Sequence, residues 1–330
     1  MVAETEALPV PKGRKKHRRR WRKQLSRQVQ YLALRVGHAV VSRLPLPLGR
    51  ALAWTVGTAT YLLLRHERAI ALHNLTCAFG DSKSERERRR IARASFQSTA
   101  QTFIEWIIIR RWSEQRVARK FSGLVEAAQK MRSRAGPRGV VGYTYHLGNW
   151  EVLSFVYGHA NPDFLVSVAK PTKFPKTQAF LHALRSTPGA SLYYTDETPR
   201  KMIRALRDGR LLGFLPDQDL RTNKGIFVDF FGRPAYSVTL PASLARKEKA
   251  QYFSCALVRE GKGFRYLEVG PEEFPWSDSE EDDVRAITER WTGHLEEMIR
   301  EYPEQWIWYY PRWRTKPERA RKHFKRGRSS

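Results

Sequence analysis

From residue 138 onward, short apolar segments alternate with amphipathic segments of helical spacing, and this alternation restricts the fold more than any other feature. The apolar segments are rich in β-prone residues and are bounded by turn residues, which predicts strands at 139–145, 163–169 and 210–215. A helix is predicted between the last two, with Pro199 in its first turn and Gly209 at its end. Strands separated by helices favour a buried, largely parallel sheet.

Two further strands are predicted at 251–258 and 264–269, antiparallel to each other around Gly261 and Gly263. Residues 282–301 then have the apolar stripe of an amphipathic helix, which Pro303 ends. For residues 138–315 we therefore expect an α/β fold, with a central mixed, largely parallel sheet and helices on both faces.

Residues 29–110 are predicted to be helical, and Ser84 with Glu87 forms a capping box at one helix start. Residues 51–64 are the most apolar stretch, but they are shorter than the roughly 20 residues of a spanning helix. We expect these N-terminal helices to be membrane-associated, lying on the bilayer or dipping into it as one short segment; a true membrane span and plain core helices are the alternatives. The simplest organisation is a single domain over residues 29–315, whose 138–315 part is the catalytic core.

The charge of the chain is strongly positive, with 60 Lys and Arg against 33 Asp and Glu and a formal net charge of +27. Such a chain attracts polyanions, which include nucleic acid, anionic lipid and acidic carrier proteins. Residues 1–28 form a basic arm without apolar periodicity, predicted to be disordered and drawn to an anionic membrane surface, and residues 316–330 are predicted to form a second basic tail. The two cysteines, Cys77 and Cys255, are too few for a zinc site or disulfide framework.

His146 follows a predicted strand directly, in the segment YTYHLGNWEVL at 143–153. Ligands bind at the carboxyl ends of parallel strands, so this histidine is placed for chemistry. Glu151 lies five residues later, a spacing that can bring its carboxylate onto the imidazole and stabilise the imidazolium. No serine or cysteine stands where a triad nucleophile is expected, so the pair suits activation of a substrate hydroxyl. The alternative is a packed histidine and an ordinary acidic residue in the first helical turn.

A second cluster, LPDQD at 215–219, also follows an apolar strand. Asp217 and Asp219 can bind a metal, hold a cation or orient the histidine, and an acidic turn is the plain alternative. Two acids and a glutamine are few ligands for a magnesium site made by protein alone.

Two further groups, together with Asn149 as a candidate substrate-binding residue, complete the candidate site residues. Phe230 and Phe231, in the predicted apolar loop 228–235, are candidates for an acyl groove or for buried core. Arg185 and Lys170 can clamp a phosphate, because guanidinium groups match its oxygens; a solvated basic face is the alternative.

Five motifs occur in one order along the chain: YHLGNWE (145–151), RSTPG (185–189), FLPDQD (214–219), DFFGRPA (229–235) and PEQWIWYYPRW (303–313). This series, together with HNLTCAFG at 73–80, closely resembles the bacterial lipid A biosynthesis late acyltransferases, the lauroyl and myristoyl transferases. These enzymes are part of the glycerolipid acyltransferase superfamily, and the mycobacterial phosphatidylinositol mannoside acyltransferases belong to the same group. The resemblance covers roughly residues 30–315.

The resemblance implies an O-acyltransferase that moves a fatty acyl chain from acyl carrier protein or acyl coenzyme A to a hydroxyl of a phosphorylated glycolipid. It places the family's histidine–acid motif on His146 and Glu151, and its acceptor-binding or catalytic arginine and aspartate on Arg185 and Asp217. Backbone amides near Gly148 and Asn149, or a basic side chain, are expected to stabilise the oxyanion. A thioester is already activated, so no cofactor and no metal is expected. The expected location is the cytoplasmic face of the bacterial inner membrane.

Three alternatives remain at this stage. The same transfer can act on another lipid, such as a phosphatidylinositol mannoside or an aminolipid. A metal-dependent hydrolase can use His146 with Asp217 and Asp219. The non-enzyme alternative is a basic nucleic-acid-binding protein, supported by the charge and by the aromatic segment 306–313, although the basic residues concentrate at the chain ends.

Overall fold

The computed structural model describes residues 12–317 except 173, 187–188, 196–198 and 221–224, and it describes side chains from residue 27 onward. The first 11 residues of the basic arm and nearly all of the basic tail at 316–330 lie outside the described residues. Helix α1 begins at Lys12, so the structure has helix where the sequence favoured a disordered arm. Lys, Arg and Gln are good helix formers, which allows this segment to extend the amphipathic helix that follows it.

Within the described residues the chain forms eleven α-helices, two short 3₁₀ helices and eight strands. The helices are α1 (Lys12–Val41), α2 (Leu46–Leu63), α3 (Arg65–Phe79), η1 (Gly80–Ser82), α4 (Glu85–Ile109), α5 (Glu114–Lys120), α6 (Ser122–Arg134), α7 (Trp150–Ala160), α8 (Pro175–Arg185), α9 (Pro199–Arg207), α10 (Leu240–Glu248), α11 (Glu280–Glu301) and η2 (Pro303–Gln305). The strands are β1 (Val140–Tyr143), β2 (Leu165–Ala169), β3 (Ser191–Tyr194), β4 (Leu211–Phe214), β5 (Gly225–Phe230), β6 (Arg233–Val238), β7 (Gln251–Glu260) and β8 (Gly263–Glu272).

Six of these strands form one sheet in the order β3-β2-β4-β1-β7-β8, in which only the β7–β8 pair is antiparallel. The expected mixed, largely parallel sheet is confirmed, as are the five predicted strands, which became β1, β2, β4, β7 and β8. Strand β3 was not predicted, because SLYY is short and lies at the sheet edge, where its pattern is only partly buried.

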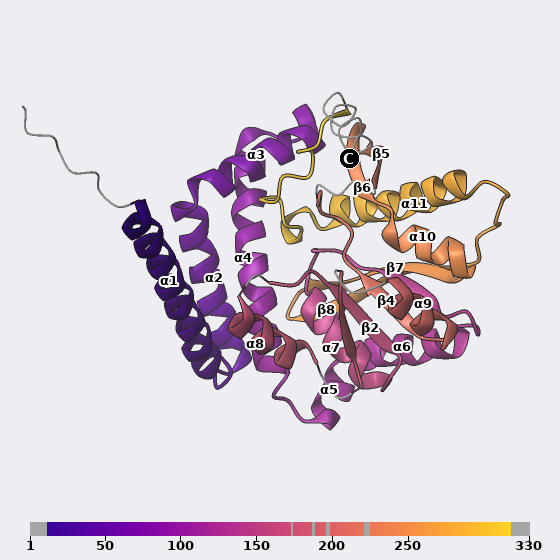
Figure 1. The fold of residues 1–330 in the computed structure, drawn as a ribbon, viewed down its shortest axis with the longest axis horizontal. Helices are drawn as coiled ribbons and strands as arrows, with labels where there is room; N and C mark the ends of the chain where they lie inside the picture. The colour runs from indigo at the N-terminus through magenta and orange to yellow at the C-terminus, as the bar shows by residue number, and fades with distance from the viewer. Residues whose placement is uncertain (1–11, 173, 187–188, 196–198, 221–224, 318–330) are drawn as a thin grey trace, which may run out of the picture.

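Helices cover both faces of the sheet, as the alternating pattern predicted. Helices α6 and α7 pack on one face, against β2, β7 and β8, while α9, α10 and α11 pack on the other, against β4, β1 and β7 (Figure 1). Alternate residues of β1 reach the two sides, so that Val140 belongs to the core under α7 and Val141 to the core under α10 and α11.

The region predicted as an apolar loop at 228–235 is instead part of the β5–β6 hairpin. Phe231 and Gly232 form its two-residue turn with φ of 56° and 69°, the backbone conformation that tight hairpins require. The sequence analysis did not predict this turn, because a bulky Phe rarely adopts a positive φ.

Helices α1–α4 lie together on one side of the molecule (Figure 1). Helix α2 packs on α4 through Gly49, Ala53, Gly57 and Tyr61, one residue in four. Gly57 is required there, because a Cβ at this position would lie 2.4 Å from the Cα of Gln97. The capping box of Ser84 and Glu87 at the start of α4 is confirmed.

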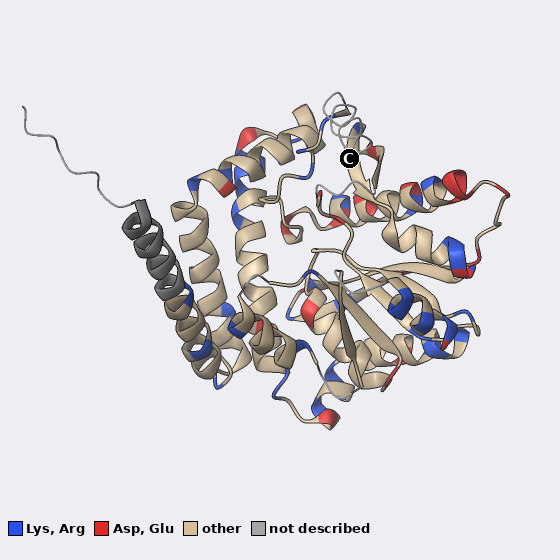
Figure 2. Cartoon of the chain, viewed as in Figure 1, with Lys and Arg blue, Asp and Glu red and all other residues tan. Residues whose placement is uncertain are grey.

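The remaining surface of α2 is largely apolar, and Arg50 is the one charged residue of this helix. Figure 2 accordingly shows α2 as a nearly uncharged helix. Within the described residues, no helix is both long and apolar enough to cross a bilayer.

Candidate functional site

His146 and Asp217 meet because they follow two neighbouring parallel strands at the same offset. Tyr143 of β1 pairs with Phe214 of β4, and each candidate residue lies three positions beyond its paired residue. The amide of Thr144 donates to the carbonyl of Phe214 at 2.9 Å, which continues the ladder beyond the strand ends. The two loops therefore leave the sheet side by side, at the carboxyl edge where parallel sheets bind ligands.

The carboxylate of Asp217 holds the imidazole of His146 and also its backbone. Oδ1 lies 2.8 Å from His146 Nδ1, and Oδ2 accepts a hydrogen bond from the His146 amide at 2.9 Å. Burial alone would raise the pKa of Asp217, but the charge and hydrogen bonds of His146 and the indole N–H of Trp306 together hold this pKa below its ordinary value. An ionised carboxylate only accepts hydrogen bonds, so Nδ1 carries a proton, and in the neutral ring Nε2 then holds the lone pair.

Trp306 is a third member of this arrangement that the sequence analysis did not single out. Its Nε1 donates to Asp217 Oδ2 at 2.9 Å, and the Ile307 amide donates to the His146 carbonyl at 3.2 Å. Asn74 of α3 donates to the carbonyls of Trp308 and Tyr310, at 2.7 and 2.6 Å, and so fixes this C-terminal segment.

The tryptophan side chains of the C-terminal segment 306–313 have a structural role. Trp306, Trp308 and Trp313 are buried in the main core. Stacking on bases requires exposed rings, so these tryptophans no longer favour a nucleic-acid-binding protein, and the positive charge is the remaining observation in its favour.

Glu151 does not hold the imidazole, as the spacing had suggested; it binds Arg185. Arg185 Nη2 and Nε donate to the two carboxylate oxygens of Glu151, at 2.5 and 3.2 Å. Glu151 occupies the second position of α7, and its carboxylate is bound at the end of α8, where Arg185 is the last residue. The guanidinium has five N–H groups, and among the described residues this pair uses two of them, which leaves three for another anion.

The backbone amides expected to form an oxyanion site are already used. Gly148 N donates to the Gln305 carbonyl at 3.1 Å, and Asn149 N donates to the Leu257 carbonyl at 2.7 Å. The Asn149 side chain, expected to bind substrate, is fully buried: its Oδ1 caps α7 at the Val152 amide. The sequence analysis missed that these two amides are occupied, because their acceptors, Gln305 and Leu257, lie far from them in the sequence.

Phe230 and Phe231, expected along an acyl groove, pack in the core between the aromatic residues Phe79, Trp306, Trp308 and Trp313. Asp219 accepts from the amide and the hydroxyl of Thr315, at 2.7 and 3.0 Å. Over the part of the chain that the structure describes, no three His, Cys, Asp or Glu side chains are grouped to hold a metal ion.

A cavity of about 600 Å³ lies beside His146, between the sheet and α7. His146, Glu151, Lys170, Arg185 and Gln218 line it, and its inner walls are apolar, made by residues such as Leu153, Tyr157, Leu165, Leu211 and Phe253. Gln218 Nε2 lies 3.4 Å from His146 Nε2, and the Trp150 ring packs edge-on against the imidazole. Asp217 lies behind the imidazole and does not line the cavity among the described residues.

The space exists because small residues stand side by side on three adjacent strands. Ser167 of β2 pairs with Gly213 of β4, which pairs with Gly142 of β1. Each of the three lines the cavity and faces α7 without a long side chain. Because these three residues are small, an apolar space remains between α7 and the sheet, and this space leads to the imidazole.

Comparison with known proteins agrees with the geometry. The sequence profile described as "Bacterial lipid A biosynthesis acyltransferase" matches residues 15–315. The chain is 26% identical over 283 residues to the lipid A biosynthesis lauroyltransferase of Escherichia coli (strain K12), covering 84% of this chain and 89% of that protein. It is 24% identical over 285 residues to the palmitoleoyltransferase of the same organism, covering 83% and 88%. A phosphatidylinositol mannoside acyltransferase of Mycobacterium tuberculosis (strain CDC 1551 / Oshkosh) is 25% identical over 226 residues, covering 67% and 69%.

Asp217→Asn should lower the free energy of unfolding at pH 7 by about 2 kcal/mol, because it weakens hydrogen bonds to a charged acceptor. The pKa of Asp217 is lowered in the folded state, so its stabilisation is present above the unfolded pKa of about 3.9 and is lost as pH falls through the folded pKa. Urea unfolding at a series of pH values should show the difference between wild type and variant at pH 5 and above, and show it shrinking below about pH 4.

Asp208→Asn provides the same isosteric change at an exposed site and serves as the control at pH 7. A difference between wild type and Asp217→Asn that stays constant down to pH 3 would contradict the assignment.

Proposed function

This chain belongs to the bacterial lipid A biosynthesis acyltransferase family and is an O-acyltransferase, and we propose that it transfers a fatty acyl chain from an acyl thioester to a hydroxyl group of a phosphorylated glycolipid of the lipid A type. The observation that carries this proposal is the opening of the His146–Asp217 pair onto an apolar cavity with cationic groups in its wall. An apolar cavity suits a hydrocarbon chain, and the pair at its side suits proton removal from an alcohol.

His146 acts as the general base in this proposal. Its Nε2 takes the proton of the acceptor hydroxyl, and the alkoxide oxygen attacks the thioester carbonyl. The tetrahedral intermediate collapses, the carbon–sulfur bond breaks, and the leaving thiolate receives the proton from Nε2. Asp217 keeps the tautomer fixed throughout and stabilises the imidazolium. A thioester is already activated, so this reaction needs neither a metal ion nor an organic cofactor.

The oxyanion requires a donor in the cavity, since the amides of Gly148 and Asn149 are occupied. Gln218 has such a donor close to the imidazole, because its Nε2 lies 3.4 Å from His146 Nε2. We assign it this role.

Arg185 binds the phosphate of the acceptor, with Glu151 holding its guanidinium in place. The pair leaves three N–H groups, and Lys170, which also lines the cavity, adds a second cation. Glu151 thus serves the reaction through Arg185, and Asp217 takes the place that the spacing gave to Glu151.

The thioester donor is acyl carrier protein or acyl coenzyme A, both of which are anionic. The exposed basic side chains of α9, which include Arg200 and Arg204, follow the cavity-lining residue Pro199 and offer such a donor an approach of opposite charge.

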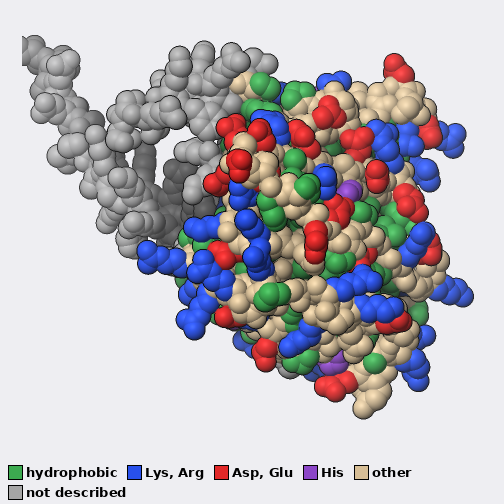
Figure 3. Space-filling view, turned by 90° about the vertical axis from the view of Figure 1, so that its right-hand side faces the viewer, with side chains coloured by type: hydrophobic (Ala, Val, Ile, Leu, Met, Phe, Trp, Pro, Cys, Tyr) green, Lys and Arg blue, Asp and Glu red, His purple; other side chains and the backbone are tan. Residues whose placement is uncertain are grey.

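The acceptor is a membrane lipid, and the N-terminal helices provide a surface that suits a bilayer. Among side chains that the structure describes, the exposed large hydrophobic ones all lie between residues 29 and 103, chiefly on α1 and α2. Val29, Leu32, Val36 and Val40 form an exposed stripe on α1. On the face shown in Figure 3, by contrast, acidic and basic side chains are interspersed. We propose that α1 and α2 lie on the cytoplasmic face of the bacterial inner membrane.

A phosphatidylinositol mannoside is the second candidate acceptor, and the mycobacterial relative is the observation in its favour. Both lipids present a phosphate near sugar hydroxyls, so the same cations serve either one. Identification of the lipid that loses an acyl chain separates them.

His146→Gln should abolish transfer, with a loss of about 10²-fold or more in kcat, because glutamine fills a similar space without accepting the proton. Mass spectrometry of total lipids should show one glycolipid lacking a single acyl chain, both in cells without the gene and in cells carrying the variant. His159→Gln, a partly buried histidine at the end of α7, is the control and should restore the chain. Normal acylation by His146→Gln would remove the proposed base.

Gly213→Val should favour shorter acyl chains. A Cβ at Gly213 meets nothing closer than 3.4 Å, and because Gly213 lines the cavity, the two methyl groups of valine are expected to occupy part of it. Each methylene that is no longer buried costs about 0.8 kcal/mol, so loss of two should reduce kcat/KM for the longer thioester by about 10-fold relative to the shorter one. Gly263→Val, an exposed glycine of β8, is the matched control. An unchanged ratio would place the acyl chain elsewhere.

Replacing Leu48, Leu62 and Leu63 together by Gln should weaken binding to vesicles that contain phosphatidylglycerol by about 10-fold or more. Full burial of a leucine contributes about 1.5–3 kcal/mol, and each substitution should remove about 1 kcal/mol of this. These side chains are exposed, so the thermal midpoint should change little. Cosedimentation in 0.5 M salt, which screens charge, isolates the apolar contribution. Equal binding by wild type and variant at high salt would show that α2 does not enter the bilayer.

A further inference from the structure

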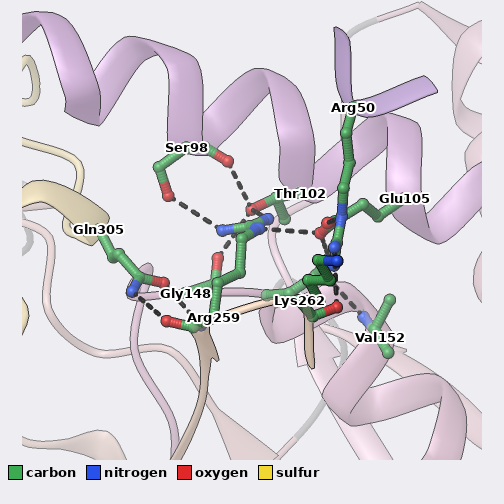
Figure 4. Close-up of polar contacts among 10 residues, drawn as sticks. Arg50, Ser98, Thr102, Glu105, Gly148, Val152, Arg259, Lys262 and Gln305 are labelled. Carbon is green, nitrogen blue, oxygen red and sulfur yellow. Dashed lines mark hydrogen bonds and ion pairs between the residues drawn. The ribbon is translucent and has the colours of Figure 1, made fainter. Parts of the chain in front are cut away.

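Glu105 of α4 carries a buried carboxylate that the proposed mechanism does not use. The side chain is fully buried. Its Oε1 accepts from Arg50 Nε at 2.7 Å, and its Oε2 accepts from Arg259 Nε at 2.8 Å and from Asn149 Nδ2 at 2.9 Å (Figure 4). Three donors from three distant segments therefore meet on one carboxylate.

A buried charge of this kind is costly to desolvate, and the two guanidinium groups compensate for it. Apolar side chains of similar size often stabilise an interior equally well, so a contribution to stability does not explain the cluster. Its hydrogen bonds are directional, however, and they fix the positions of the groups that they join.

The first of these groups is Asn149, between His146 and Glu151. Because Nδ2 of its amide faces the Glu105 carboxylate, Oδ1 faces the other way and accepts from the Val152 amide at 3.0 Å. This bond caps α7 and sets where the helix begins. The start of α7 in turn places Glu151, which holds Arg185 at the cavity.

The second group is Arg259, which carries the effect to Gly148. Its Nη2 donates to Thr102 Oγ1 at 3.0 Å, and that hydroxyl donates to the Gly148 carbonyl at 2.7 Å (Figure 4). Gly148 has φ of 66°, and a Cβ there would lie 2.2 Å from the Leu257 carbonyl oxygen, so the turn is held close against β7.

We propose that Glu105 is a positioning residue: its carboxylate holds Asn149 and Arg259 and thereby fixes the turn that carries His146 on one side and Glu151 on the other. The inference rests on the proposed function for its kinetic consequence. Its structural content, the ordering of residues 146–153 by a carboxylate of α4, is independent of which lipid is acylated.

Glu105→Gln keeps the shape of the side chain and removes its charge. In the full-length protein, well below the thermal midpoint, kcat should fall by about 10²-fold, the cost of misplacing a catalytic group by roughly 1 Å. KM for the acyl thioester should stay within about 2-fold, because the cavity walls come from the sheet and the body of α7. Hydrogen exchange of the amides at 149–153 should become faster, while that of β1 and β4 is unchanged.

Asn149→Ser separates positioning from capping. Serine caps a helix as well as asparagine does, but it has no amide N–H to bind Glu105. The variant should lower kcat in the same way, and the double variant Glu105→Gln/Asn149→Ser should be no slower than the slower single variant. This variant also decides the matter if Glu105→Gln does not fold.

Glu126→Gln is the matched control, because Glu126 is an exposed glutamate on α6 paired with Lys130. It should change neither kcat nor exchange at 149–153. Folded Glu105→Gln with wild-type kcat and wild-type exchange would overturn the proposal, as would additive losses in the double variant. A wild-type protein that transfers no acyl chain would refute the proposed function, while the exchange comparison would still decide whether Glu105 orders the turn.

Discussion

The arrangement of the site depends on the carboxylate of Asp217, which is buried and accepts three hydrogen bonds. Two come from His146, through its ring and its amide, and the third comes from Trp306. A buried carboxylate must be paired with donors to be tolerated. The carboxylate therefore holds these three donors in place, just as they hold the carboxylate. Three segments far apart in the sequence, those after β1, after β4 and after η2, are thereby joined at one point.

The sequence predicted most of the sheet, and it identified both residues of the pair without pairing them. The strands were recognisable from their local composition, and orientation of the histidine was one of the roles considered for Asp217. What local sequence cannot reveal is that β4 lies next to β1, since two strands and three helices intervene between them. Without that adjacency, Glu151 was the nearest acid along the chain. Once Tyr143 is paired with Phe214, the equal offsets place Asp217 on His146.

The residues missed outside the sheet were missed for a related physical reason. Apolar spacing directs attention to the stripe of a helix that packs, and on α4 the apolar residues at helical spacing are Ala92, Phe96, Ala100, Phe103 and Ile107. Phe103 is in fact exposed. A second stripe, made by Ser95, Ser98, Thr102 and Glu105, is buried and polar. Polar residues at helical spacing ordinarily face water, so only the tertiary structure distinguishes a buried polar stripe from a solvated one.

Helix α4 connects the two halves of the molecule because its two stripes face different partners. Its contacts with α2 are close and apolar, made against small residues such as Gly57. Its polar stripe instead binds the backbone of the α/β half: Ser95 donates to the Trp306 carbonyl, and Thr102 donates to the Gly148 carbonyl. Arg50 connects the two sides of α4, because it is a residue of α2 whose side chain binds Glu105 of the polar stripe. The turn at Asn149 is thereby joined to α2 through two hydrogen bonds, one from Arg50 to Glu105 and one from Asn149 to Glu105.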